Sequence, residues 1–186
     1  MAAMTLASCG INSVPTAEED AKAKWADVQA QYQRRSNLIG NLVATVKGAA
    51  KQEQDTLVRV TEARAKATSV QVSAEDLSDP AKVAQFQAAQ GALSQSLGRL
   101  LANVEAYPDL KSNQNFLELQ SQLEGTENRI AVAIRDYNGS VQAYNTRIRT
   151  FPDAIGAKLI HGAKPMTPYQ ATTPGAEEAP KVDFGG

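Results

Sequence analysis

Residues 116–151 read FLELQSQLEGTENRIAVAIRDYNGSVQAYNTRIRTF, and this stretch decides the fold class. Its apolar and aromatic positions advance alternately by three and four residues, a spacing that places them along one face of a helix. Two successive steps of four, from Thr126 to Ile130 to Ile134, interrupt the alternation once. The pattern predicts a long bundle helix with one local stutter.

Two further intervals repeat this pattern between prolines, which break helices. Residues 81–107 form one of them and residues 16–79 the other. As an uninterrupted helix, the interval of residues 16–79 would extend far beyond its partners. Gly40 and Gly48 are the predicted positions at which it kinks or turns back. We therefore predict an all-α antiparallel bundle, with four helices if this interval turns back and three long helices if it only kinks.

Composition divides the chain into three regions. Residues 1–15 are predicted to be a truncated signal and tether, and residues 16–156 the helical bundle. Thr16 and Glu19 have the capping-box pattern that marks a helix start. Residues 157–186 hold four of the eight prolines and are predicted to form a flexible, mostly extended tail. Its end, residues 180–184, alternates apolar and polar residues, which makes it a candidate docking strip.

The composition excludes several function classes. Lys and Arg number 19 against 20 Asp and Glu, so no positive excess is available for nucleic acid. A single His and a single Cys exclude His/Cys zinc sites and disulfide frameworks. No phosphate-binding glycine motif and no run long enough for a membrane-spanning helix occurs. His161, the only histidine, has no evident orienting partner, so we predict a non-catalytic protein without metal or cofactor.

Charged residues interrupt the apolar stripe of the first interval. Arg35, Glu53 and Arg64 fall where the register points toward other helices, and buried charges are costly unless paired. Three interpretations stay open: side chains at a seam edge with their heads in water, an Arg/Glu network that fixes helix register, or a pocket for an anionic head group. The candidate polar-layer and binding residues are Arg34, Arg35, Asn37, Asn41, Glu53, Arg64, Asn113, Asn115, Glu127, Asn128, Arg129, Tyr137, Asn138, Tyr144 and Asn145.

Asparagine recurs within and beside the predicted helices, although its amide competes for backbone hydrogen bonds and disfavours a helix interior. Helix capping and interhelical hydrogen bonds are one explanation. A polar recognition groove built from the Asn and Tyr positions is the other.

The sequence Leu6-Ala7-Ser8-Cys9 has the pattern of a bacterial lipobox, which predicts lipidation of Cys9. Residues 12–19 would then tether the bundle to its lipid. Residues 1–5 carry no positive charge and are too short for a full signal peptide. Three explanations stay open: the natural start lies upstream of Met1, the sequence is trimmed, or the match is accidental.

In order along the chain, these motifs resemble the LemA family of bacterial envelope proteins. The first matching blocks are Trp25, Arg34-Arg35-Ser36-Asn37-Leu38-Ile39-Gly40-Asn41-Leu42-Val43, Val46-Lys47-Gly48, Glu53 and Thr61-Glu62-Ala63-Arg64. The later ones are Leu97-Gly98-Arg99-Leu100-Leu101, Glu105-Ala106-Tyr107-Pro108-Asp109-Leu110-Lys111, Asn113-Gln114-Asn115-Phe116, Thr126-Glu127-Asn128-Arg129-Ile130-Ala131, Arg135, Tyr137-Asn138, Val141, Tyr144-Asn145, Phe151-Pro152 and Ala179-Pro180-Lys181-Val182-Asp183-Phe184. Coverage from Ala21 to Phe184 is nearly continuous.

The resemblance implies an antiparallel helical bundle held at the cell envelope, with its domain outside the cytoplasm and without established catalytic activity. Two departures stand out: the family usually has an N-terminal transmembrane helix, which the lipobox would replace, and a proline where this chain has Gly40. The resemblance also implies an accessory role in envelope maintenance, with a TPM-domain protein or a membrane protease as candidate partner. The alternative is an envelope protein that holds a lipid head group or other anion through its Arg, Glu and Asn side chains.

Overall fold

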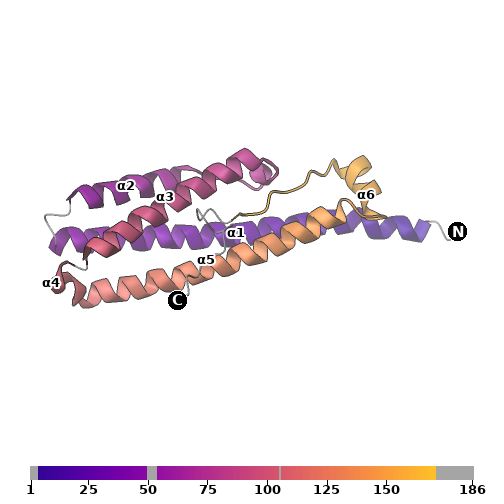
Figure 1. Ribbon diagram of the computed structural model, residues 1–186. Coiled ribbons are helices and arrows are strands. Elements are labelled where there is room, and N and C mark those ends of the chain that lie inside the picture. Colours follow the sequence, from indigo (N-terminus) through magenta and orange to yellow (C-terminus); the bar gives the residue numbers. More distant parts are fainter. Residues whose placement is uncertain (1–3, 50–53, 105, 171–186) are drawn as a thin grey trace, which may run out of the picture.

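The computed structural model describes the backbone of residues 4–49, 54–104 and 106–170, and the side chains of this part apart from residues 4–11 and 49. The long helices are α1 (Met4–Ala49), α2 (Gln54–Ser69), α3 (Pro80–Val104) and α5 (Gln114–Arg147). The short ones are η1 (Glu75–Ser78), α4 (Pro108–Lys111), α6 (Asp153–Gly156) and η2 (Ala157–His161). The described part thus contains helices, connections and one extended segment (Figure 1).

The long helices form an antiparallel bundle (Figure 1). α1 and α5 pack along each other, and α2 and α3 form a hairpin that lies over one half of this pair. The chain turns back between Ala49 and Gln54, so the first interval of the sequence forms two helices. The predicted all-α bundle is confirmed in its four-helix form.

Gly48 lies one residue before the end of α1 and so beside the turn, but the predicted turn or kink position at Gly40 is wrong. Gly40 lies inside α1, where the guanidinium of Arg64 on α2 passes directly over it. A Cβ added at Gly40 would lie 3.2 Å from Cζ and 3.2 Å from Nη2 of Arg64. Glycine at this position therefore permits the close approach of an arginine rather than a bend.

α1 begins upstream of the predicted capping box and continues through Pro15. Thr16 does not cap a helix start, because its hydroxyl donates to the carbonyl of Asn12 in the preceding turn, over 2.7 Å. Val14 is fully buried in the bundle, and Ser13 Oγ donates to Asp153 Oδ2 over 2.8 Å. Because packing against the C-terminal region covers this turn, residues 12–19 form helix instead of the expected tether.

The chain after η2 follows the bundle in extended form (Figure 1). Gly162 ends η2 with a left-handed φ of 56°, a conformation that favours glycine. Met166 is buried, and Thr167 N donates to the carbonyl of Leu77 over 2.8 Å. Residues 157–170 thus belong to the packed structure, contrary to the predicted tail boundary. Residues 171–186, with the predicted docking strip at 180–184, lie outside the described residues.

The core consists of two clusters, one in each half of the bundle. We call the first the hairpin half; it is closed by α2 and α3 and contains Leu42, Val60, Leu100 and Phe116 among others. We call the second the tail half; it contains Trp25, Phe86, Tyr137, Tyr144 and Met166 among others. In the tail half, the first turns of α3 contribute Val83 and Phe86, and beyond them the extended segment and α6 continue along the side that α2 and α3 cover in the hairpin half. Among the described helices, none combines the length and apolar character needed to cross a bilayer.

Candidate functional site

The boundary between the two halves is polar. Within the described residues, the buried polar side chains are those of Arg35, Ser36, Gln87, Gln90 and Thr126. Along each helix these residues stand between apolar side chains of one cluster and those of the other. We call this boundary the central polar layer.

Arg35 on α1 is the centre of this layer, with only 2% of its surface exposed. Its Nη2 donates to Gln90 Oε1 over 2.6 Å and to the Gln90 carbonyl over 3.3 Å. Its Nη1 donates to Ser94 Oγ over 2.9 Å and to Glu127 Oε1 over 3.2 Å. Gln90 Nε2 in turn donates to the carbonyl of Ala67 on α2, over 3.3 Å. One guanidinium therefore connects α1, α3 and α5 directly, and α2 through Gln90.

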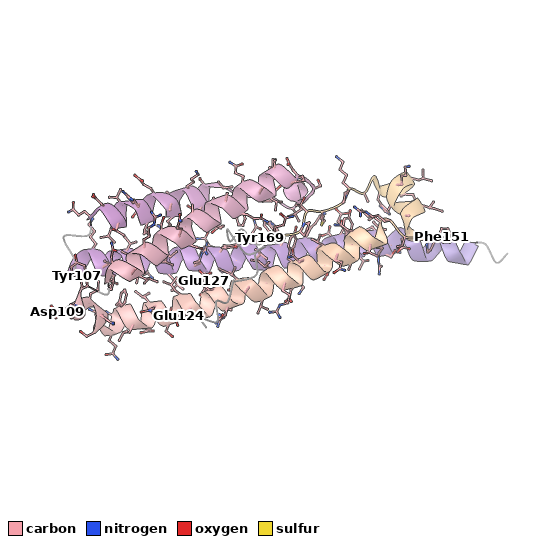
Figure 2. All side chains as sticks on the ribbon, viewed as in Figure 1. Tyr107, Asp109, Glu124, Glu127, Phe151 and Tyr169 are labelled. Atoms are coloured by element: carbon pink, nitrogen blue, oxygen red, sulfur yellow. The ribbon has the colours of Figure 1, made fainter. Side chains whose placement is uncertain are left out.

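The extended segment also reaches this layer. The hydroxyl oxygens of Tyr32 on α1 and Tyr169 lie 2.5 Å apart, within hydrogen-bond distance. The Tyr32 ring in turn lies 4.8 Å from Cζ of Arg35, a cation–π contact. Figure 2 labels Tyr169 and Glu127 in the middle of the molecule, from the segment and from α5. Burial raises the pKa of both tyrosines above their usual value, so both remain neutral hydrogen-bonding groups.

Arg64 makes a second, smaller contact between helices. Its Nε donates to the Ser36 carbonyl over 2.7 Å and to Ser36 Oγ over 3.2 Å, which joins α2 to α1. Ser36 is buried, and Arg64 is half-buried. Of the interpretations left open by the sequence, the interhelical network therefore describes Arg35 and Arg64. Glu53 lies outside the described residues.

The paired residues Tyr137-Asn138 and Tyr144-Asn145 on α5 hold the extended segment by its main chain. Asn145 donates to the Met166 carbonyl and accepts from Met166 N, each over 2.8 Å. Asn138 forms the same pair of hydrogen bonds with the main chain of Tyr169. It donates to the carbonyl over 2.9 Å and accepts from the N–H over 2.7 Å. We call these four side chains the Tyr-Asn ladder.

The two tyrosines of the ladder complete the pattern. Tyr137 donates to the Thr167 carbonyl over 2.8 Å, and Tyr144 donates to the Lys164 carbonyl over 3.0 Å. Seven residues of helix span about 10.5 Å, and three residues of an extended polyproline-like chain about 9.3 Å. A repeat of seven on α5 therefore matches a repeat of three on the segment, where Pro165 and Pro168 also recur.

The remaining candidates from the sequence do not join these two groups. Asn113 caps α5, since its Oδ1 accepts from the N–H groups of Asn115 and Phe116. Asn37 is exposed and accepts a hydrogen bond from Gln33 over 3.0 Å. Also exposed are Arg34, Asn41, Asn115, Asn128 and Arg129. Cys9 lies in the first turns of α1, and its side chain is outside the described part.

Sequence reasoning missed several partners of these groups. Gln90 was a signal that could have been used, because it interrupts the apolar stripe of α3 as Arg35 interrupts that of α1. Met166 and Tyr169 gave no usable signal, since they contribute main-chain atoms to the ladder and those carry no residue-type information.

Residues 24–184 match the LemA family. The chain belongs to the LemA family. The central polar layer and the Tyr-Asn ladder lie entirely inside the matched residues 24–184. The chain is 29% identical over 157 residues to Magnetosome protein MamQ 2 of Paramagnetospirillum magneticum, covering 76% of this chain and 58% of that protein. The same identity and shares are found with Magnetosome protein MamQ of Magnetospirillum gryphiswaldense.

A relative with the family's own name is Protein LemA of Metamycoplasma hominis, 28% identical over 134 residues. The match covers 71% of this chain and 57% of that protein. The aligned region thus spans less than three fifths of the length of these curated relatives.

Proposed function

We propose that this LemA-family chain is a membrane-anchored, non-catalytic helical interaction protein of the bacterial cell envelope, with an accessory role in envelope maintenance. Lipidation of Cys9 is the proposed anchor. The observation that carries the interaction role is the use of the polar side chains. Arg35, Asn138 and Asn145 direct their hydrogen bonds to other parts of the same chain, so they hold the fold together and leave its outer faces for partners.

The shape of the molecule supports anchoring at the N-terminal end. α1 extends at that end past the α2–α3 hairpin (Figure 1). Residues 4–17 of α1 contain no charged residue, and they include Cys9 in its lipobox sequence. An anchor there would present α2, α3 and α4 away from the membrane. The proposed partners at those faces are a TPM-domain protein or a membrane protease of the envelope.

The test is intact-mass spectrometry of the protein recovered from membranes of its own host, with Cys9→Ala as control. We expect a diacylglyceryl-sized addition on Cys9, and we expect both the addition and membrane partitioning to be lost in Cys9→Ala. An unmodified Cys9 in a protein that partitions equally with and without the thiol would contradict the proposed anchor.

A ligand-binding role is the second candidate, favoured by a groove of about 350 Å³ between α1, α2 and α3. It opens beside the central polar layer and is lined by Tyr32, Gln33, Ser36, Gln71 and Gln90, among others. Amides and hydroxyls supply its polar lining, and no lining side chain is charged. This chemistry suits a neutral polar ligand better than the anion suggested by the sequence.

A thermal-shift screen tests this second role, because a ligand specific for the folded state raises stability by mass action. Stabilisation by a neutral polyol or sugar, abolished in Gln33→Ala, would support the groove. Stabilisation by anionic head groups alone would instead support the Arg-based site expected from the sequence.

A further inference from the structure

Large apolar side chains are exposed together at the end of the molecule where α1 begins. Among the described residues, seven large hydrophobic side chains are exposed, and four of these lie within residues 151–160: Phe151, Ile155, Leu159 and Ile160. Phe151 is 82% exposed and Leu159 77%. Figure 2 labels Phe151 at this end, beside α6.

The helical stretch formed by α6 and η2 packs in an unusual way. Its small residues Gly156 and Ala157 are buried, while Ile155, Leu159 and Ile160 face solvent. A surface helix normally directs its large apolar residues toward the core. A clustered exposed apolar surface in a folded protein marks a contact with a partner or a membrane.

This stretch is held firmly against the bundle. Asp153 accepts from Ser13 Oγ over 2.8 Å and lies 3.7 Å from Arg147 Nε. Arg147 also donates to the Ser13 carbonyl over 3.3 Å. The exposed face is therefore presented in a fixed orientation relative to α1.

The charges around this face favour an anionic surface. In residues 147–160, Arg147 and Asp153 pair with each other, which leaves the cations Arg149 and Lys158 without a carboxylate of the same stretch, whereas Lys164 farther along shares a pocket with Glu18 and Glu75. Lys158 lies next to Leu159 in η2 and is exposed. Residues 4–17 of α1, at the same end, are uncharged. Apolar side chains flanked by cations are typical of segments that insert into the interface of anionic bilayers.

We propose that the apolar face of residues 151–160 with its flanking cations is a membrane-docking surface for anionic phospholipid bilayers. Leu159, Ile160 and Phe151 enter the head-group region, and Arg149 and Lys158 contact lipid phosphates. The docking extends the proposed function, on which it rests for the orientation of the molecule. The docking fixes the orientation of the bundle's long axis relative to the bilayer through protein side chains as well as through the lipid on Cys9.

The experiment measures sedimentation of the full-length Cys9→Ala chain with vesicles of phosphatidylglycerol and phosphatidylcholine in equal parts, and with phosphatidylcholine alone. Because this chain lacks the Cys9 thiol, vesicle binding is measured independently of lipidation. A failure of the mass-spectrometry test of the anchor can therefore be distinguished from a failure of vesicle binding. We expect binding to the anionic vesicles. We expect the double variant Leu159→Ser/Ile160→Ser to lower the partition coefficient about tenfold or more, because two large apolar side chains no longer insert.

The matched control is Val58→Ser/Leu117→Ser, which removes two side chains of similar size that are 53% and 49% exposed outside this face. It should bind the anionic vesicles as the parent does. Arg149→Gln/Lys158→Gln should remove the preference for anionic over zwitterionic vesicles. All variants change exposed side chains, and circular dichroism checks that each is folded.

Absence of vesicle binding by the Cys9→Ala chain would overturn the proposal, as would an equal loss of binding in Leu159→Ser/Ile160→Ser and in the control Val58→Ser/Leu117→Ser. A third outcome would also overturn it: no vesicle binding, together with a concentration-dependent dimer that Leu159→Ser/Ile160→Ser abolishes. That result would assign the face to a second copy of the chain.

Discussion

The hairpin half and the tail half each bury an apolar cluster, but different backbone structures cover the two clusters. In the hairpin half, α2 and α3 satisfy their own main-chain groups and contribute aliphatic side chains such as Val60, Leu93 and Leu100. In the tail half, an extended segment covers part of the core, and an extended chain has no internal hydrogen bonds. The Tyr-Asn ladder therefore supplies donors and acceptors for it.

This difference explains the asparagines that the sequence made conspicuous. Asn138 and Asn145 reduce helix propensity in the middle of α5. In exchange, each side chain forms two hydrogen bonds with the main chain of the extended segment. The tail half also has the aromatic cluster, in which the Trp25 ring lies 5.4 Å from Phe86 and 5.1 Å from Tyr137. Both halves thus contain paired helices, but the tail half also depends on specific side-chain contacts to the extended segment. Conditions that disrupt such contacts should therefore affect the two halves differently.

Alkaline pH should have the largest effect and should act on the tail half. Burial raises the pKa of Tyr32, Tyr137, Tyr144 and Tyr169 in the folded chain. Below about pH 10, the usual tyrosine pKa, these groups are protonated in both states and their stabilising contribution is complete. Above it, the unfolded chain loses protons first, so stability falls as the pH rises toward the folded-state pKa. Tyrosinate absorbance, followed with the fluorescence of Trp25, measures this.

We expect most of the five tyrosines to ionise only as the Trp25 signal changes. Ionisation of all five near pH 10 with unchanged fluorescence would show that these side chains are accessible in the folded state.

Replacing Arg35 should uncouple the two halves. Arg35→Met keeps much of the volume but leaves Gln90 and Ser94 without their donor, at a cost of about 2–3 kcal/mol in the free energy of unfolding. Urea unfolding measured by Trp25 fluorescence and by far-ultraviolet circular dichroism should then give two separate transitions. The control is Arg34→Met, which changes an exposed neighbour and should stay within about 0.5 kcal/mol of the parent. Coincident transitions in Arg35→Met would mean that the layer does not couple the halves.

Removing a ladder asparagine should weaken the tail half alone. Asn138→Ala loses two hydrogen bonds to Tyr169, and the better helix propensity of alanine offsets part of the loss, which leaves about 1 kcal/mol. Amide hydrogen exchange of Tyr169 and Met166 should accelerate, while exchange in α2 stays as it was. Asn128→Ala, an exposed asparagine of the same helix, should leave the exchange of both amides unchanged. Equal protection in the two variants would contradict the role of the ladder.

The smallest effect concerns the closeness of α1 and α2 in the hairpin half. Gly98→Ala, with nothing within 4 Å of the added Cβ, should stabilise the chain by about 0.5–1 kcal/mol through helix propensity. At Gly40 the same gain should be cancelled, because the new Cβ displaces Arg64 from Ser36. Thermal unfolding of both variants measures this difference. In an Arg64→Ala background the gain at Gly40 should return, and its absence there would refute the proposed clash.

Local sequence features determined much of this fold. The three- and four-residue spacing in residues 116–151 predicted α5, because apolar periodicity marks the buried face of a helix whichever element packs against it. Helix capping was one of the two roles expected for the asparagines, and Asn113 has it because a cap acts within a few residues: its Oδ1 accepts from Asn115 N over 3.0 Å. The start of α1 was mispredicted because the packing that covers Val14 comes from residues far along the chain.

Only the tertiary structure decided how the polar residues are used. The sequence identified Arg35 as a charge on an apolar face, but its partners Gln90, Ser94 and Glu127 come from helices whose relative register no local pattern fixes. It identified the asparagines of α5, but the groups they bind are main-chain atoms of a proline-containing segment that composition alone assigns to a flexible tail. Periodicity is a property of one segment, whereas hydrogen-bond partnership depends on which segments meet, and the close packing of the whole bundle determines that.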